Sequence, residues 1–195
     1  ELINSKKKFI FKATNTTKSK ILSFNKRKFT SFKFKDDNYD KKILKELQTS
    51  DYILVSIPPK KKKDLVLKKF SKFLINLKFQ KLIYLSATSV YGDHAGRWVN
   101  ENSKLKGKTL FGLARRASEK AWKNFREKSR LDINILRVSG IYSKEKNVLK
   151  KILRKNIYVK EKKYFSRIRI EDLAVIIKKM FFSLKKSMIL NASDD

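Results

Sequence analysis

The stretch that decides the fold is LIYLSATSVYGDHAGRWVNE, residues 82–101. It begins with a β-rich apolar run, Leu82 to Leu85, and passes directly into small hydroxyl residues and an aromatic–glycine–acid turn. In an open parallel α/β sheet, ligands bind just beyond the carboxyl ends of the strands. Polar groups that directly follow a buried strand are therefore site candidates. The hydroxyl-bearing candidates here are Ser86, Thr88 and Tyr91.

Short β-rich runs alternate with helical patterns along the chain, which is typical of βαβ units and a mainly parallel sheet. The sequence predicts strands at Lys8–Ala13, Thr30–Phe34, Tyr52–Ile57, Lys81–Ser86 and Asp132–Val138. Their interiors are almost continuously apolar, as expected for strands covered on both faces. Helices are predicted near 40–48, 62–79 and 109–129, and the Lys60–Lys63 run is expected to begin the second of these as a solvated segment.

The pattern changes after Gly140. A lysine-rich helix is predicted near 147–155, a strand pair near 157–169, a helix that opens at Glu171–Asp172 and a last strand at Met188–Asn191. Acidic residues suit a helix start because the helix dipole favours negative charge there. We therefore expect a partial Rossmann-like domain over residues 1–143 and a small α/β lobe, also partial, over 144–195.

Composition restricts the function classes. The chain has 195 residues, of which 41% are hydrophobic, so it can bury a core as one domain or as one domain and part of a second. It contains no cysteine and a single histidine, His94, so no metal site is expected. Lysines interrupt every apolar run before it reaches the roughly 20 residues that a membrane-spanning helix needs. Without a leader-like opening, no membrane contact and a cytoplasmic location are expected.

The formal net charge of +32 raises the possibility of a nucleic-acid partner. However, the basic residues are spread evenly along the chain, and most are lysine, whereas base-edge recognition favours arginine. A solvated lysine surface is the preferred interpretation, with no specific nucleic-acid partner. A polyanion-binding basic module remains an alternative, with steep salt dependence as its mark.

Residues 86–101 resemble the extended and atypical short-chain dehydrogenases/reductases, also called the NAD-dependent epimerase/dehydratase family. Atypical members read V-Y-G-D-x-x-G-x-W-V-x-E, matched here by Val90–Asp93, Gly96, Trp98, Val99 and Glu101. Further segments resemble family motifs in order: Asp51–Pro59, Leu136–Tyr142 and Phe165–Ala174. The resemblance covers most of residues 8–195 and implies an α/β fold, a Rossmann-like doubly wound parallel sheet.

The resemblance also implies a first strand and a glycine-rich turn that hold the pyrophosphate of a dinucleotide. The chain has five glycines, none before Gly92, and no G-x-G-x-x-G. The resemblance places the predicted strand at Lys8–Ala13 second in the family's sheet. Truncation at both ends is one explanation, and a shortened protein that lost its cofactor is the other.

NAD or NADP is the cofactor that the resemblance implies. The end of the family's second strand distinguishes the two, because an acid there binds the ribose hydroxyls of NAD. Here the corresponding residues include Thr14 and Asn15, and a lysine but no acid follows, which favours NADP. An ordinary polar turn explains these residues equally well. Ser56 and Pro58 lie in the stretch Asp51–Pro59, which resembles the fourth strand of atypical members, and are further cofactor-binding candidates.

The family's usual catalytic pair is a tyrosine and a lysine four residues later, preceded by a Ser/Thr at a strand end. Alignment of Phe111 to Glu119 with Y-G-x-x-K-x-x-x-E places Phe111 at the tyrosine and Arg115 at the lysine, and Ala87 takes the hydroxyl position. Phenylalanine has no proton to transfer, and arginine does not deprotonate. The remaining catalytic candidates are therefore Ser86, Thr88 and Tyr91, although a tyrosine in this turn is more often a packing or pocket residue.

Arg137 and Arg167 are the candidates to hold an anionic substrate such as a sugar-nucleotide, because arginine pairs well with phosphate. The alternative is that they pair with nearby acids such as Asp132 or Asp172. Three hypotheses follow. The preferred one is an oxidoreductase or epimerase with a non-standard acid. The alternatives are a non-catalytic NAD(P)-binding sensor or scaffold and a polyanion-binding basic protein.

Overall fold

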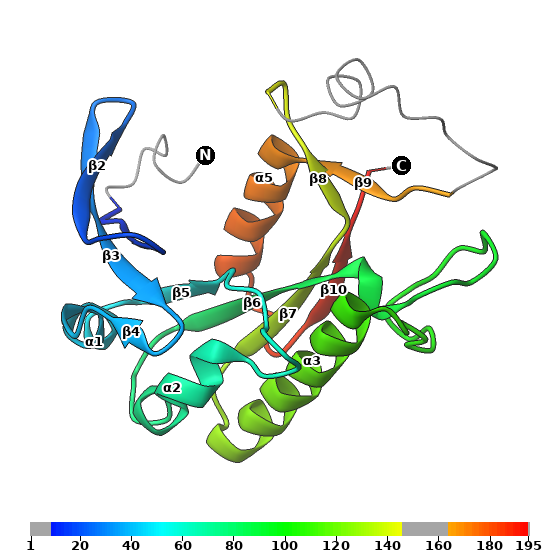
Figure 1. Ribbon diagram of the computed structural model, residues 1–195, viewed down its shortest axis with the longest axis horizontal. Helices are drawn as coiled ribbons and strands as arrows, with labels where there is room; N and C mark the ends of the chain where they lie inside the picture. Colours follow the sequence, from blue (N-terminus) through cyan, green and yellow to red (C-terminus); the bar gives the residue numbers. More distant parts are fainter. Residues whose placement is uncertain (1–8, 146–163, 195) are drawn as a thin grey trace.

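A parallel four-stranded sheet forms the central layer, with strand order β10-β7-β6-β5 (Figure 1). The computed structural model describes residues 9–145 and 164–194. The strands are β5 (Tyr52–Val55), β6 (Lys81–Ala87), β7 (Ile133–Val138) and β10 (Ile189–Ala192). Every neighbouring pair in this sheet is parallel, so the four carboxyl ends meet at one edge, called here the carboxyl edge. The predicted parallel sheet is confirmed.

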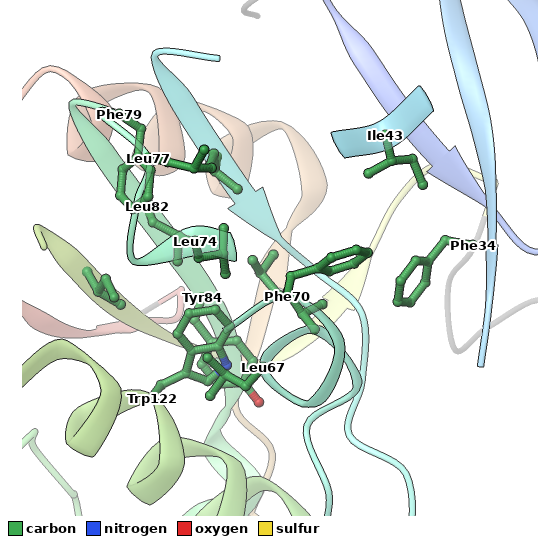
Figure 2. Packing of buried hydrophobic residues seen from close by; sticks show 14 of the residues in the cluster. Phe34, Ile43, Leu67, Phe70, Leu74, Leu77, Phe79, Leu82, Tyr84 and Trp122 are labelled. Carbon is green, nitrogen blue, oxygen red and sulfur yellow. The ribbon is translucent and has the colours of Figure 1, made fainter. Parts of the chain in front are cut away.

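Helices cover both faces of this sheet. Helices α2 (Leu65–Leu74) and α3 (Leu110–Ser129) lie on one face, and α5 (Ile170–Phe181) lies on the other (Figure 1). Side chains alternate along a strand, so Leu82 and Tyr84 pack toward α2 and α3, where Tyr84 stacks on Trp122 (Figure 2). Ile83 packs with α5 in a second apolar cluster. The fold is therefore the doubly wound, Rossmann-like arrangement.

The amino-terminal strands form a separate sheet, also of four strands, in the order β1-β3-β2 with β4 paired to β3. Its elements, followed by helix α1, are β1 (Lys12–Asn15), β2 (Lys20–Phe24), β3 (Arg27–Lys35), β4 (Asn38–Tyr39) and α1 (Lys42–Gln48). Strand β1 is parallel to β3, whereas β2 and β4 are antiparallel to it. The sequence pattern did not indicate β2 or β4, and it placed the first strand too early. Strand β2 is mostly exposed, so it lacks the apolar run that marked the other strands.

The Lys60–Lys63 run forms a tight turn, so the predicted helical start there is wrong. Lys60 and Lys63 exchange both backbone hydrogen bonds, each 2.9 Å long. Lys61 and Lys62 consequently adopt left-handed backbone angles, with φ of 47° and 59°. Helix α2 begins only after Asp64, whose carboxylate accepts hydrogen bonds from the backbone N–H groups of Val66 and Leu67 and so caps the helix.

Replacement of Lys62 by glycine is expected to stabilise the protein by about 0.5–1 kcal/mol. A left-handed backbone is strained for lysine and unstrained for glycine, and two-residue turns of this shape favour glycine at the second position. Urea unfolding of the Lys62→Gly variant measures the change. Lys63→Gly is the matched control, because the φ angle of Lys63 is not positive and glycine there only adds freedom to the unfolded chain. An equal gain in both variants would contradict the explanation from strain.

The carboxy-terminal part contributes to the same sheet. Glu171 and Asp172 lie in the first turn of α5, as predicted, and the predicted last strand is β10. Strands β8 (Gly140–Tyr142) and β9 (Arg167–Arg169) form a small parallel pair. The predicted helix near 147–155 and most of the predicted strand pair near 157–169 lie outside the described residues, and the division at residue 143 stays a prediction. No helix in the described part of the chain is long and apolar enough to cross a membrane.

Candidate functional site

The predicted site residues of three neighbouring strands meet at the carboxyl edge. Strand β6 ends in Ser86 and Ala87 and leads into a 3₁₀ turn, η1 (Thr88–Val90). Ser86 lies beside Arg137 of β7 in the sheet register. On the other side of β6, Ser56 directly follows the last residue of β5. The parallel topology thus brings together hydroxyl and cationic side chains that are far apart in sequence.

A buried ion pair joins β7 to helix α3 at this edge. The Arg137 guanidinium donates to the Glu119 carboxylate from Nη2 at 2.9 Å and from Nε at 3.1 Å, and the two side chains are only 2% and 1% exposed. Ser86 Oγ donates to the same carboxylate at 2.6 Å. Burial opposes the charge of Arg137, but the hydrogen bonds and charge of Glu119 outweigh it and raise the pKa of Arg137.

Tyr91 extends this network to the last strand of the sheet. Its hydroxyl accepts a hydrogen bond from Arg137 Nη1 at 2.8 Å and donates to Asn191 Oδ1 at 2.7 Å. Glu101 closes the network, because its backbone carbonyl accepts from Arg137 and its carboxylate accepts from the Asn191 N–H. Ser86, Tyr91 and Arg137 are each buried. A direct role of these three in catalysis or substrate binding would require this network to open.

Thr88 is the catalytic candidate outside the network. It lies half-buried in η1, where its backbone carbonyl accepts from the Tyr91 N–H at 3.0 Å. Within residues 9–145 and 164–194 no hydrogen bond engages its hydroxyl. The start of α3 lies against this turn, and a Cβ added at Gly112 would lie 2.7 Å from the Ser89 carbonyl oxygen. Glycine at this position therefore allows the helix to approach η1 closely.

The acids that the sequence offered as partners for the two arginines pair elsewhere. Asp132 lies 3.4 Å from the buried Lys81 ammonium, and Asp172 forms a two-point hydrogen bond with Arg169. The Asp172 hydrogen bond raises the pKa of Arg169. Arg167 instead stacks on the Phe165 ring, with its guanidinium carbon 5.1 Å from the ring centroid. In the part of the chain that the structure describes, no carboxylate forms an ion pair with Arg167.

The cofactor candidates lie at the ends of β1 and β5. Thr14, Ser56 and Pro58 are exposed, so their side chains are available to a ligand. Asn15 is half-buried, and its side chain shapes its own turn. The side-chain Oδ1 accepts from the Thr17 N–H, and the side-chain Nδ2 donates to Ser31 Oγ, each at 2.9 Å. The exposed polar groups at these strand ends could hydrogen-bond to a nucleotide. Asn15 instead stabilises the turn after β1.

Helix α3 carries Phe111 and Arg115, the two residues that the resemblance aligns with the usual catalytic tyrosine and lysine. Phe111 is 81% exposed in the first turn of the helix, near the end of β6. One turn later, Arg115 Nη1 donates to the Leu85 carbonyl at 2.7 Å and to the Tyr84 hydroxyl at 3.3 Å. Burial raises the pKa of the Tyr84 phenol. Helix α3 therefore holds a fixed cation at the end of β6, with an exposed aromatic ring one turn earlier and no proton donor at position 111.

Asp64 fixes the position of α3 relative to α2. Besides capping α2, its carboxylate accepts from Ser118 Oγ at 2.6 Å and from Trp122 Nε1 at 2.9 Å, both on α3. The aspartate is 6% exposed, so these four hydrogen bonds compensate a buried charge. The role of Asp64 as a helix cap can be predicted from the sequence, because an acid directly precedes an apolar helical run. Its contacts to α3 cannot be predicted in this way.

Replacement of Asp64 by alanine is expected to lower the free energy of unfolding by about 2–4 kcal/mol, because it removes a helix cap and leaves two buried donors without a partner. Urea unfolding measures the loss. Trp122→Phe is the matched variant, since it removes one of these hydrogen bonds and keeps a large ring, so a smaller loss is expected. If Asp64→Ala unfolds at the wild-type urea concentration, the carboxylate does not hold the two helices.

Comparisons with known proteins agree with this geometry. The model of the NAD dependent epimerase/dehydratase family matches residues 68–172, which are 105 of the 195 residues. A solved structure of a functionally unknown conserved protein from Silicibacter pomeroyi DSS is 29% identical, with a TM-score of 0.67, over 74% of this chain and 51% of that one. No curated protein matches in sequence.

Two structures of known enzymes share the fold at lower identity. UDP-glucuronic acid 4-epimerase from Bacillus cereus, in complex with UDP-glucuronic acid and NAD, is 16% identical over 80% of this chain and 58% of its own, with a TM-score of 0.66. dTDP-glucose 4,6-dehydratase from Bacillus anthracis str. Ames, in complex with NAD, is 13% identical over 78% and 54%, with a TM-score of 0.61. The chain thus spans a little over half the length of these structures. Since the family match covers more than half of its residues, the chain belongs to the NAD-dependent epimerase/dehydratase family.

Proposed function

We propose that the protein binds NAD or NADP together with a sugar-nucleotide or a related small molecule at the carboxyl edge. Ser56 and Thr88 directly follow the neighbouring parallel strands β5 and β6, and this placement carries the proposal. Arg167 lies against Gly140, two residues after the end of β7. Such strand ends are where open α/β sheets bind their ligands. Family membership supports the cofactor, and solved neighbours that contain NAD and UDP-glucuronic acid support the substrate class.

Thr14, Asn15, Ser56 and Pro58 are the residues proposed to hold the nucleotide. When bound, the cofactor supplies hydride exchange with a substrate carbon. NADP is the preferred form, because the turn after β1 contains hydroxyl and amide groups and the exposed Lys18 but no acid. A lysine there offers a cation to a 2′-phosphate, whereas the acid that would bind the ribose hydroxyls of NAD is missing.

Two candidate functions share this binding site. One is an oxidoreductase or epimerase that uses Thr88, Ser86 or Tyr91 to transfer the proton. The other is a non-catalytic NAD(P)-binding sensor or scaffold, and it is favoured because two of the three candidate hydroxyls are engaged and only that of Thr88 is left. Phe111 has no proton to give, and the Tyr91 and Ser86 hydroxyls are engaged in the buried network around Arg137. A phenol that already donates to Asn191 and accepts from a cation is poorly placed to exchange a proton with a ligand.

Isothermal titration of the intact protein with NADP and with NAD tests the binding proposal. We expect saturable binding at one site, tighter for NADP, that persists at high salt, whereas a polyanion-binding module loses its affinity steeply with salt. Lys18→Glu is expected to weaken NADP binding by about tenfold and NAD binding much less. Lys20→Glu, an equal change of charge on exposed β2, is the control. Equal losses in both variants, or no binding of either nucleotide, would overturn the cofactor assignment.

A further inference from the structure

A cavity of about 490 Å³ lies at the amino ends of β1 and β3, in the amino-terminal sheet. Two chain segments line it, Phe9–Lys12 and Arg27–Thr30. Because Lys12 and Thr30 are the first partners in the register of β1 and β3, the cavity lies where the two segments run past the start of that pairing. Small-molecule sites in proteins have volumes of roughly 300–1,000 Å³, so this cavity has the size of a binding site.

The cavity has apolar walls. Phe9, Ile10, Phe11 and Phe29 contribute to its lining. The Phe9 ring packs against the rings of Phe11 and Phe182, with centroids 6.2 and 5.9 Å apart, so this wall is held against the end of α5. Ile10 is 90% exposed, which leaves a large apolar side chain in water. An apolar ligand in the cavity would remove this surface from water, and such burial favours binding.

The same cavity carries positive charge. Lys12, Arg27 and Lys28 line it, and none of its described lining residues is acidic. Lys12 already has a counter-ion, because its ammonium lies 3.4 Å from the Glu46 carboxylate. Over residues 9–145 and 164–194, no carboxylate forms an ion pair with Arg27 or Lys28. Two cations without counter-ions beside apolar walls complement a molecule with an apolar body and an anionic head.

We infer that this cavity binds a free long-chain carboxylate, with the tail between the apolar walls and the head at Arg27 and Lys28. A guanidinium donates two parallel hydrogen bonds to a carboxylate, which makes Arg27 the main partner of the head group. The inference goes beyond the proposed function. The nucleotide candidates Thr14 and Asn15 lie at the carboxyl end of β1, whereas the cavity lies at its amino end.

Isothermal titration of the intact protein with dodecanoate, kept below the concentration at which it forms micelles, tests this inference. We expect saturable binding of one dodecanoate per chain. Decanoate is expected to bind about tenfold more weakly, because two fewer methylene groups are buried. Dodecanol is also expected to bind about tenfold more weakly, because it lacks the charge. The many surface lysines attract carboxylates whatever their chain length, so equal affinities for dodecanoate and decanoate would overturn the inference.

Substitutions of exposed residues locate the site without disturbing the core. Arg27→Glu is expected to weaken dodecanoate binding by about tenfold or more, and Ile10→Ser by about threefold to tenfold. Lys35→Glu and Ile21→Ser are the matched controls, because both residues are exposed in the same sheet and lie outside the cavity lining. The controls are expected to bind as wild type does. Equal losses in each variant and its control show that dodecanoate binds elsewhere and overturn the inference.

The remaining outcomes separate this site from other occupants. Saturating NADP is expected to leave dodecanoate affinity unchanged, and competition between the two would overturn the inference while the proposed function stands. Loss of NADP binding with dodecanoate binding intact has the opposite meaning. Sedimentation velocity tests for a second copy of the chain. A dimer that does not bind dodecanoate and that Ile10→Ser converts to a monomer assigns the cavity to that copy and overturns the inference.

Discussion

Replacement of Glu119 by alanine is expected to lower the free energy of unfolding by about 3–5 kcal/mol. The change leaves the Arg137 guanidinium buried at 2% exposure without its counter-ion and removes the acceptor of the Ser86 hydroxyl. A buried charge without a partner is costly because the interior solvates it poorly. Urea unfolding followed by circular dichroism measures the loss.

A double-mutant cycle separates the ion pair from the rest of the network. Glu119→Leu combined with Arg137→Met removes both charges and keeps apolar volume, so we expect a smaller loss than the sum of the single losses, and smaller than that of Glu119→Ala. Asp172→Ala is the exposed control, because its pair with Arg169 lies at the surface and is expected to contribute less than about 1 kcal/mol. Strictly additive losses in the cycle would contradict direct coupling of Glu119 to Arg137.

The central sheet is the part of the fold that was predictable from the sequence. Strand β7 is buried at every position from Ile133 to Val138. A strand covered on both faces has a nearly continuous apolar run rather than alternating apolar and polar residues, and this run predicted the strand. Strand β2 has the opposite character, because it is mostly exposed at the edge of the amino-terminal sheet and turns through Asn25 and Lys26. Such a turn normally contains glycine at its second position. Lysine stands there in this chain, so the sequence carried no hairpin signal.

The candidate site was predictable as a set of residues but not as a set of contacts. The parallel topology places Ser86, Tyr91 and Arg137 together, as their positions after strands suggested. The common partner of Ser86 and Arg137 is Glu119, which comes from helix α3. In the sequence, only its place at the end of the stretch that resembles Y-G-x-x-K-x-x-x-E indicated it. Proximity in sequence favoured Asp132 as a partner for Arg137, yet Asp132 pairs across the sheet with Lys81. Partners across strands depend on register, which the sequence does not show.

Ser139 illustrates the same limit from the other side. Ser86 is the penultimate residue of β6 and Ser139 directly follows β7, yet the hydroxyl of Ser86 is paired and that of Ser139 is not. The difference depends on whether helix α3 brings a carboxylate to the strand end. Only the coordinates of Glu119 relative to the two strands show which of the two hydroxyls has a partner.

The double variant Phe111→Tyr with Arg115→Lys is expected to gain hydride exchange with bound NAD by about a hundredfold to ten-thousandfold over wild type, the usual contribution of a positioned general acid or base. Phe111 is 81% exposed near the end of β6, so a hydroxyl on its ring meets no buried surface. Position 115 lies one helical turn later, and a lysine there lowers the pKa of the new phenol by its charge.

The absorbance of reduced nicotinamide, after the variant with NAD is mixed with UDP-glucuronic acid, measures this gain. Leu110→Tyr with Arg115→Lys is the matched control, because Leu110 is 82% exposed on the same turn but points about 100° away around the helix. The control is expected to stay at the wild-type rate. A phenol at position 110 lies on a different side of the helix from the lysine at 115, so the lysine charge does not lower its pKa. If wild type already exchanges hydride as fast as Phe111→Tyr/Arg115→Lys, another acid carries the reaction. In that case the enzyme candidate, with Thr88 or Tyr91 as the acid, replaces the non-catalytic one.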